Sequence, residues 1–313
     1  MNHHVVIGAG PVGSGIAALL AHRGTPVTVV TRSGSGIDHP LVTKSAADAT
    51  DADALGRAAL GAAAIYNCAN PPYHKWAGDW PPMHLAMMTA AERSGAVLVM
   101  MDNLYAFGSG STMPMREVDA MNAVGTKGAM RARMARELLE AHSAGRLRAT
   151  LARASDFYGP QVLGSTFGDR VVPRVLLGKK VSLLGSLDVP HSVSYMGDVA
   201  NTLVTIAEDE RAWGRPWHVP NAPAQTQREV VQAFATAAGT TAKVTAVPKP
   251  ALSVLGVFVP MMRELKETWY QFAEPWVTDS TLTEQTFGLS ATSIEDGAAA
   301  TVAWWRHQQL VSK

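Results

Sequence analysis

The 313-residue chain has little of several features that would define its class. It has a single cysteine, Cys68, so no disulfide can form within the chain, which favours a reducing compartment such as the cytoplasm. Its net charge is +1, which argues against nucleic acid or an anionic membrane surface as partner. Its 10 histidines show no spacing typical of a metal site. We therefore expect a cytoplasmic protein that holds no metal.

Long hydrophobic runs are also missing. The longest apolar stretch near the C-terminus, residues 251–262, contains Pro260 and is shorter than the roughly 20 apolar residues of a membrane-spanning helix. The N-terminus lacks the charged-then-apolar order of a secretory signal. The sequence therefore predicts neither a membrane span nor secretion.

The first thirty residues carry the clearest pattern. A short apolar run, residues 5–7, is followed by the glycine-rich segment 8–13, by a helix-forming segment and by a second apolar run, residues 27–30. Strand, glycine turn, helix and strand in this spacing predict a dinucleotide-binding unit. The three glycines would make the tight turn, admit a pyrophosphate and let the helix pack closely, with the anion on the helix N-terminus. The cofactor-binding residues expected from this turn are Gly8, Gly10, Pro11, Val12 and Gly13.

The residues after the second predicted strand indicate which dinucleotide is bound. NAD-binding proteins place a carboxylate about 20 residues beyond the first glycine, on the ribose 2′-hydroxyl. Here Thr31, Arg32 and Ser33 occupy that region, and the first carboxylate is Asp38. A planar guanidinium suits a phosphate, and the two hydroxyls add donors. We therefore predict NADP(H) rather than NAD(H).

Apolar runs alternate with helical segments at intervals typical of a doubly wound parallel sheet, a Rossmann α/β fold. After about residue 155 this alternation decays. We predict an NADP-binding domain over residues 1–155, to which residues 191–220 return. A smaller, discontinuous C-terminal lobe, residues 156–190 and 221–313, would bind the substrate.

Ligands of such sheets bind beyond the carboxyl ends of the strands. Residues that follow predicted strands are therefore further candidates for cofactor contact: Asp48, Ala69, Asn70 and Ala154. Trp76 and Trp80 lie after the fourth predicted strand, where they would line an apolar substrate pocket or belong to the ordinary core, which we favour.

The order of these features resembles the atypical or extended short-chain dehydrogenase/reductases, the NAD(P)-dependent epimerase/dehydratase-like group. The stretches that carry the resemblance are Asp48-Ala-Thr-Asp51, Asn67-Cys-Ala-Asn-Pro71, Gly125-Thr-Lys127-Gly, Arg153-Ala-Ser-Asp-Phe-Tyr-Gly-Pro160 and Tyr195-Met-Gly-Asp-Val-Ala200. In that family a Tyr-x-x-x-Lys pair on the helix after the fifth strand performs the proton transfer. Lys127 matches the lysine, but Ala123 stands where the tyrosine would be.

The resemblance implies an NADP(H)-dependent oxidoreductase that reduces a carbonyl or conjugated small molecule, with its proton from another group. Tyr105 is our candidate donor because it follows the fifth predicted strand, and Asn103 would bind the substrate oxygen. Lys127 would keep its role on the nicotinamide ribose. Two alternatives stay open: a non-catalytic NADP(H)-binding redox sensor of the NmrA-like kind, and a sugar-nucleotide epimerase or dehydratase. A homodimer is compatible with the sequence.

Overall fold

The computed structural model describes residues 3–252 and 264–311, and these form two compact units, each considered by itself. Unit 1 comprises Met1–Gly108, Glu117–Arg153 and Val199–Val219, and unit 2 comprises Ser109–Arg116, Ala154–Asp198 and Pro220–Lys313. Most of the apolar stretch 251–262 lies outside the described residues.

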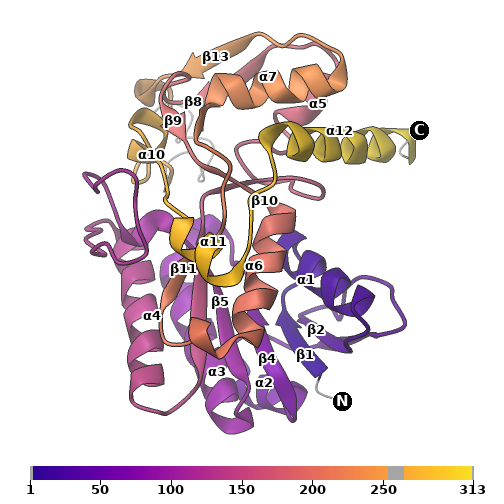
Figure 1. Cartoon of the computed structure of the whole chain (residues 1–313), viewed down its shortest axis with the longest axis vertical. Coiled ribbons are helices and arrows are strands. Elements are labelled where there is room, and N and C mark those ends of the chain that lie inside the picture. Colours follow the sequence, from indigo (N-terminus) through magenta and orange to yellow (C-terminus); the bar gives the residue numbers. More distant parts are fainter. Residues whose placement is uncertain (1–2, 253–263, 312–313) are drawn as a thin grey trace. The chain divides into compact units, whose positions relative to one another are not determined.

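Unit 1 is built on a seven-stranded sheet with the strand order β11-β6-β5-β4-β1-β2-β3 (Figure 1). Strand β1 pairs in parallel with β2 and β4, β2 with β3, β4 with β5, and β6 with β11. The strands are β1 (His3–Ile7), β2 (Val27–Thr31), β3 (Val42–Ala46), β4 (Ala62–Asn67), β5 (Val97–Asn103), β6 (Ala149–Ala154) and β11 (Pro216–His218). The predicted Rossmann α/β class is confirmed, and its carboxyl edge collects the ends of these strands.

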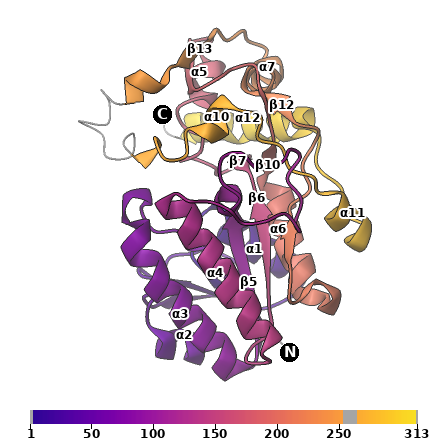
Figure 2. The same ribbon diagram turned by 90° about the vertical axis from the view of Figure 1, so that its left-hand side faces the viewer.

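Five helices cover this sheet: α1 (Pro11–His22), α2 (Ala52–Ala58), α3 (Trp76–Ser94), α4 (Thr126–Ser143) and α6 (Met196–Glu208). Helices α2, α3 and α4 lie side by side on one face (Figure 2). Helix α1 contacts the unit 1 part of α6, where a methyl group added at Gly15 would lie 3.3 Å from the Ala200 Cβ. Short 3₁₀ turns complete the unit at η1 (Tyr73–Lys75), η2 (Leu104–Ala106) and η3 (Glu210–Ala212).

The sequence pattern predicts helices that begin near residues 82 and 118, and the structure differs at both. Helix α3 starts at Trp76, not near residue 82, and contains Pro81 and Pro82, because the turn before the prolines buries Trp76 and Trp80. Helix α4 starts at Thr126, not near residue 118. The backbone N–H of Ala123 donates instead to the Ala106 carbonyl at 3.1 Å, which keeps Ala123 in the preceding loop. Ala123 and Lys127 therefore do not share a helix.

The described residues of unit 2 form three two-stranded sheets and several helices. The strand pairs are β7 (Asp156–Tyr158) with β10 (Val193–Tyr195), β9 (Pro190–His191) with β12 (Gln225–Thr226), and β8 (Val181–Leu184) with β13 (Val244–Val247). The helices of unit 2 that the structure describes are α5 (Val172–Leu176), α7 (Gln227–Ala238), α10 (Tyr270–Ala273), α11 (Thr281–Phe287) and α12 (Ile294–Val311). Its core is formed around Tyr158, Phe167 and Phe234, and the ring of Phe234 contacts the rings of the other two.

The units differ in detail from the predicted domains. Residues 199–219 return to unit 1, whereas 191–198 belong to unit 2 because β10 pairs with β7. Residues 109–116 also belong to unit 2, where the Met115 N–H donates to the Val277 carbonyl at 2.8 Å. The role of this unit in binding substrate stays a prediction.

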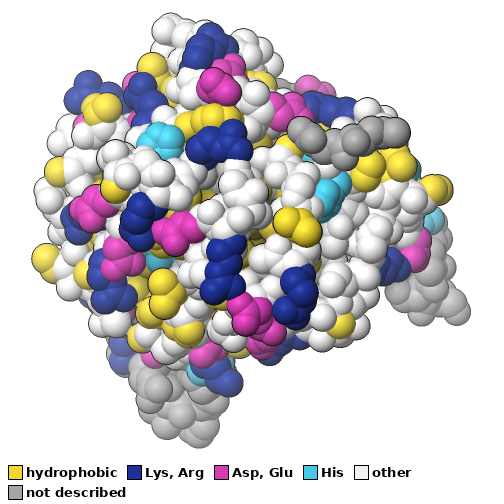
Figure 3. All heavy atoms as spheres, turned by 90° about the horizontal axis from the view of Figure 1, so that it is seen from below, with side chains coloured by type: hydrophobic (Ala, Val, Ile, Leu, Met, Phe, Trp, Pro, Cys, Tyr) yellow, Lys and Arg dark blue, Asp and Glu magenta, His cyan; other side chains and the backbone are white. Residues whose placement is uncertain are grey.

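No helix within residues 3–252 and 264–311 combines the length and apolarity needed to cross a membrane. On the face drawn in Figure 3, basic and acidic side chains are interspersed and neither sign forms a continuous patch. This surface therefore offers no one-signed field to a charged partner.

Candidate functional site

The glycine turn between β1 and α1 is tightly packed at its first and last glycines. Gly8 has a φ of +101°, and a methyl group there would lie 2.7 Å from the Ala69 nitrogen. A methyl group at Gly13 would lie 2.0 Å from the Gly8 carbonyl oxygen. Both positions therefore require glycine for the backbone itself, because no side chain can approach a peptide group so closely.

Gly10 differs from its two neighbours. It is exposed, and a Cβ added to it meets no heavy atom within 4 Å. It is the N-cap residue of α1, and among the described residues no side chain caps this helix. The first N–H groups of a helix need an acceptor, and together with the helix dipole they favour an anion. The open space at Gly10 and the uncapped helix end fit a pyrophosphate.

The segment after β2 exposes a cation. Arg32 is exposed, and no hydrogen bond or ion pair holds its guanidinium within the described part of the chain. On either side, the Thr31 hydroxyl donates to the Ser35 carbonyl at 3.0 Å and the Ser33 hydroxyl donates to the Ser35 hydroxyl at 3.0 Å. These bonds shape the turn and leave the Arg32 side chain available to an anionic ligand.

The first two carboxylates after Arg32 in the sequence, Asp38 and Asp48, have other partners. Asp38 forms an ion pair with Lys44 of β3. Asp48 accepts from the backbone N–H of Thr50 at 2.9 Å and from its hydroxyl at 2.7 Å. These bonds, and to a smaller extent the charge of Arg32, lower the pKa of the Asp48 carboxyl. Both carboxylates are therefore already bonded within the chain.

The carboxyl end of β4 holds an unpartnered polar atom. Asn67 is 1 % exposed, and its Oδ1 accepts from the Ala69 N–H at 3.2 Å. Its Nδ2 is buried and has no hydrogen-bond partner among the described residues. Cys68 follows, and burial of its thiol raises the pKa, as expected of a structural cysteine rather than a nucleophile. The buried donor of Asn67 and the exposed Asn70 fit a polar ligand beside Gly8.

The carboxyl end of β5 brings the predicted catalytic residues near an additional tyrosine. Asn103 caps η2 by accepting from the Tyr105 N–H at 3.0 Å. The Tyr105 hydroxyl lies 3.4 Å from the Tyr73 hydroxyl. The Lys127 Nζ, on a side chain that is largely buried, lies 4.7 Å from the centre of the Tyr73 ring. Tyr73 therefore stands between the two residues that the sequence singles out for proton transfer.

Close packing of small residues brings the first turn of α4 to this cluster. A Cβ at Gly128 would lie 2.6 Å from the Tyr105 carbonyl oxygen and 2.5 Å from the Ala123 Cβ. Only glycine at position 128 lets α4 approach η2 so closely. The methyl of Ala123 fills this contact, and the ring of Trp76 packs on Tyr105 at a centroid distance of 5.8 Å.

A buried ionic network lies next to the cluster. Asp102, the residue before Asn103, accepts from Arg131 Nε at 2.8 Å and from Arg153 Nε at 3.3 Å. The guanidinium of Arg131 also lies 4.6 Å from the centre of the Trp80 ring. The indoles of Trp76 and Trp80 are thus core residues of unit 1 that pack around a buried cation.

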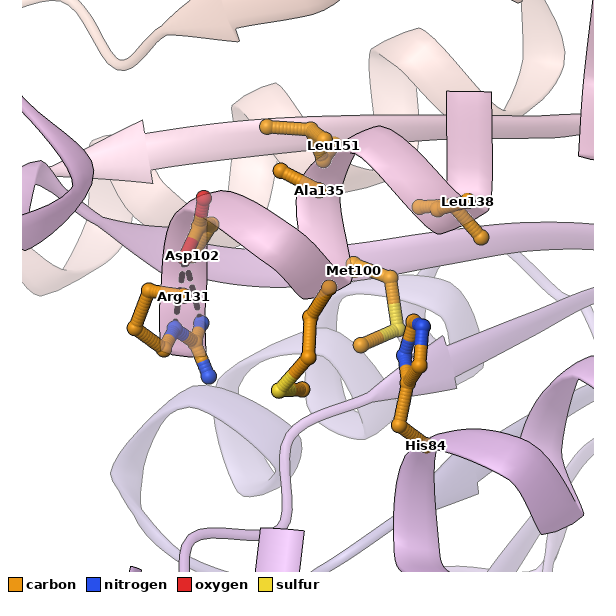
Figure 4. A pocket seen from close by; sticks show the side chains of 8 residues that line it. His84, Met100, Asp102, Arg131, Ala135, Leu138 and Leu151 are labelled. Atoms are coloured by element: carbon orange, nitrogen blue, oxygen red, sulfur yellow. Dashed lines mark hydrogen bonds and ion pairs between the residues drawn. The ribbon is translucent and has the colours of Figure 1, made fainter. Parts of the chain in front are cut away.

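A small cavity borders this network between α3, α4 and the sheet (Figure 4). Its lining is mostly apolar, and its polar members are His84, Asp102 and Arg131. The Nε2 of His84 lies 3.6 Å from a Glu137 carboxylate oxygen, too far for a hydrogen bond. Burial lowers the pKa of His84 to about 4, with a further contribution from Arg131. His84 is therefore neutral at pH 7.

The predicted site residues thus gather mainly at the carboxyl edge of one sheet. Nearly all of them belong to unit 1: the glycine turn, Thr31 to Ser33, Asp48, Ala69, Asn70, Asn103, Tyr105 and Lys127. Ala154 ends β6 and is the first residue of the second segment of unit 2. Sequence reasoning places Asp102 at the rim without a role, and it assigns no role to Tyr73, Arg131 or Arg153. Lys127 and Arg131 are four residues apart and therefore lie on one helix face. This spacing is the signal in the sequence that links Arg131 to the site.

No cluster of three His, Cys, Asp or Glu residues suited to a metal ion occurs within residues 3–252 and 264–311.

Comparisons with known proteins agree with this architecture. Residues 4–219 match the model of the NAD dependent epimerase/dehydratase family. No curated protein matches the sequence. The dTDP-glucose 4,6-dehydratase DesIV of Streptomyces venezuelae, a double mutant with NAD bound, is 18% identical with a TM-score of 0.79, over 99% of this chain and 98% of that one. UDP-glucose 4-epimerase of Thermotoga maritima is 17% identical with a TM-score of 0.80, over 99% and 100%. WbmH of Bordetella bronchiseptica, in complex with NAD+, is 19% identical with a TM-score of 0.73, over 98% and 99%.

Proposed function

We propose that this chain, which belongs to the NAD dependent epimerase/dehydratase family, is an NADP(H)-dependent oxidoreductase that reduces a carbonyl or conjugated small molecule. Membership of the family supports a nicotinamide dinucleotide as the cofactor class. The phosphate preference and the reductase reaction are our inferences from residues of this chain.

The cofactor would be held by the carboxyl edge of the unit 1 sheet. The turn at Gly8, Gly10 and Gly13, with Pro11 and Val12, would bind the pyrophosphate at the start of α1. Arg32 would bind the 2′-phosphate. The hydroxyls of Thr31 and Ser33, which donate to Ser35, would turn from that residue to the phosphate. The remaining proposed contacts are Asp48, Ala69, Asn70, Lys127 and Ala154. When bound, the nicotinamide supplies the hydride.

The chemistry of the chain itself would reside in Asn103, Tyr105 and Lys127. The observation that carries the proposal is the cluster in which Tyr73 contacts both the Tyr105 hydroxyl and the Lys127 ammonium. Tyr105 would donate a proton to the substrate oxygen, and the Asn103 side-chain amide, whose Oδ1 caps η2, would offer its N–H groups to that oxygen. Lys127 would bind the nicotinamide ribose and place a positive charge beside the donor.

Sugar-nucleotide epimerisation or dehydration is the second candidate. It is favoured by the structural neighbours, two of which are named as a dTDP-glucose dehydratase and a UDP-glucose epimerase. At identities of 17–18% these neighbours share the fold, and they do not fix the substrate. A redox sensor that binds NADP(H) without turnover is the third reading.

The test is a screen for NADPH oxidation over aldehydes, ketones and enones, with sugar nucleotides as a parallel set. We expect turnover of at least one carbonyl compound, and Tyr105→Phe should reduce kcat about 100-fold or more while NADPH affinity is kept. NADPH binding without turnover of either set would identify a sensor. Conversion of a sugar nucleotide without net NADPH oxidation would identify an epimerase or dehydratase.

A further inference from the structure

We infer that Tyr73 is the partner of Lys127 and forms with Tyr105 a two-hydroxyl proton relay that replaces the single tyrosine missing at position 123. This inference rests on the proposed reductase function and specifies how its proton is delivered. In this relay Tyr105 is the residue that meets the substrate, and Tyr73 acts through it.

Tyr73 makes two contacts, one through its hydroxyl and one through its ring. Its hydroxyl meets the Tyr105 hydroxyl at 3.4 Å, a long hydrogen bond of the kind that shortens when a substrate binds. Its ring lies below the Lys127 ammonium, with the Nζ 4.7 Å from the ring centre. A positive charge over a phenol favours the phenolate more than the neutral form, because ionisation adds negative charge to the ring. The charge of Lys127 therefore acts first on Tyr73.

Packing fixes this arrangement from two sides. The rings of Tyr73 and Trp76 meet edge to face at 5.0 Å, and Trp76 also packs on Tyr105 at 5.8 Å. The first turn of α4 approaches η2 through Gly128 and so brings Lys127 to the same place. The loop that follows β4 thus supplies a tyrosine to a lysine whose own helix offers none four residues earlier, where Ala123 is held in the loop before α4.

The proton balance of the relay closes. A bound dinucleotide would supply the hydride to the carbonyl carbon, and the electron pair of the C=O π bond would then move to the oxygen. That oxygen takes the proton of Tyr105, whose phenolate takes the proton of Tyr73. The negative charge then rests on Tyr73 beneath Lys127, and a proton from solvent restores it. The product is an alcohol and the oxidised dinucleotide.

The inference can be tested on the full chain without a substrate, by following tyrosinate formation in the ultraviolet as the pH rises. The chain has six tyrosines, and burial raises the pKa of four of them: Tyr66, Tyr158, Tyr195 and Tyr270. The first ionisation should therefore belong to the pair Tyr73 and Tyr105, which titrates as a unit. We expect Tyr73→Phe to remove this first step or move it upward by about one pH unit, and Lys127→Met to move it upward as well.

Tyr66→Phe is the matched control, because it deletes a hydrogen-bonded hydroxyl in the same unit, 2.9 Å from His4 Nδ1, and should leave the first step unchanged. A first step of equal midpoint and amplitude in wild type and Tyr73→Phe would overturn the relay, as would a Lys127→Met variant that titrates like wild type. With a carbonyl substrate in hand, Tyr73→Phe should lower kcat about tenfold and shift its pH profile while KM is kept. Unchanged kcat and pH profile would equally overturn the relay. Absence of any turnover would contradict only the proposed function, because the titration reports on Lys127 and Tyr73 by itself.

Discussion

Arg131 binds one oxygen of Asp102 through both Nε and Nη2, at 2.8 and 2.5 Å, while the two side chains are only 4% and 5% exposed. Arg131 lies one helical turn beyond Lys127, and Asp102 immediately precedes Asn103. The ion pair therefore ties the first turns of α4 to the end of β5, the two elements that carry the proposed catalytic residues. Arg153 binds the second oxygen at 3.3 Å, and burial lowers the pKa of this arginine against the opposing effect of Asp102.

Removing the charge of Asp102 should destabilise the fold strongly. Asp102→Asn keeps the size of the side chain but leaves two buried guanidinium groups without their shared counter-ion, which costs about 3–5 kcal/mol. Urea denaturation at pH 7 measures the loss. Asp53→Asn, which breaks the exposed ion pair with Arg93, is the matched control and should change the stability far less. Equal losses of unfolding free energy in the two variants would show that the buried network stabilises the fold no more than an exposed ion pair.

His84 should make the stability depend on pH. Its pKa is about 4 in the folded chain against 6.5 when unfolded, so between these values the unfolded state binds the additional proton. The contribution of neutral His84 to the free energy of unfolding is therefore fully present above pH 6.5 and is lost as the pH falls toward 4. Between pH 7 and pH 5 the loss is about 2 kcal/mol. Urea denaturation at a series of pH values measures this. The free energy of unfolding of His84→Gln should change less with pH over this range than that of wild type. His22→Gln, at an exposed histidine, should retain the wild-type slope; a variant at position 84 that does so too would contradict the assignment.

The first half of the fold follows from local sequence. The apolar runs at residues 5–7 and 27–30 form strands β1 and β2, as predicted. Gly8 and Gly13 are required by the backbone of their own turn, because Gly8 has a positive φ and Gly13 lies against a carbonyl. Asp51 caps α2 as its position suggests, accepting from the Ala54 N–H at 2.9 Å. These features depend on neighbours along the chain, and such features are visible in a sequence.

The site was less predictable because it depends on contacts between distant segments. Tyr73 reaches Lys127 across 54 positions, and its role follows only from the meeting of the loop after β4 with the first turn of α4. The start of α4 was misplaced because residues 118–125 contain no helix breaker until Gly125. Tertiary contacts, such as the bond from Ala123 to Ala106, decide that boundary.

The middle and last glycines of the turn, Gly10 and Gly13, should respond differently to substitution. Gly10→Ala adds a methyl group that meets no protein atom, so its stability should change by less than about 1 kcal/mol. The same methyl enters the proposed pyrophosphate site and should weaken NADPH binding strongly. Gly13→Ala places its methyl against the Gly8 carbonyl and should destabilise the fold by about 1–3 kcal/mol. Calorimetric titration with NADPH, alongside thermal unfolding, separates the two effects. Normal NADPH binding by Gly10→Ala would rule out this turn as the pyrophosphate site.

Arg32 should determine which dinucleotide is preferred. Its exposed guanidinium forms no hydrogen bond or ion pair within the described residues, and the next two carboxylates along the chain, Asp38 and Asp48, are bonded to Lys44 and Thr50. A charged hydrogen bond to a phosphate contributes about 1.5–3 kcal/mol, so Arg32→Ala should weaken NADPH binding roughly ten- to a hundredfold and leave NADH binding nearly unchanged. Arg57→Ala removes the same charge from the exposed side of α2 and should preserve the preference. Equal affinity of the wild-type chain for NADPH and NADH would contradict the role of Arg32, and so would a preference that survives its removal.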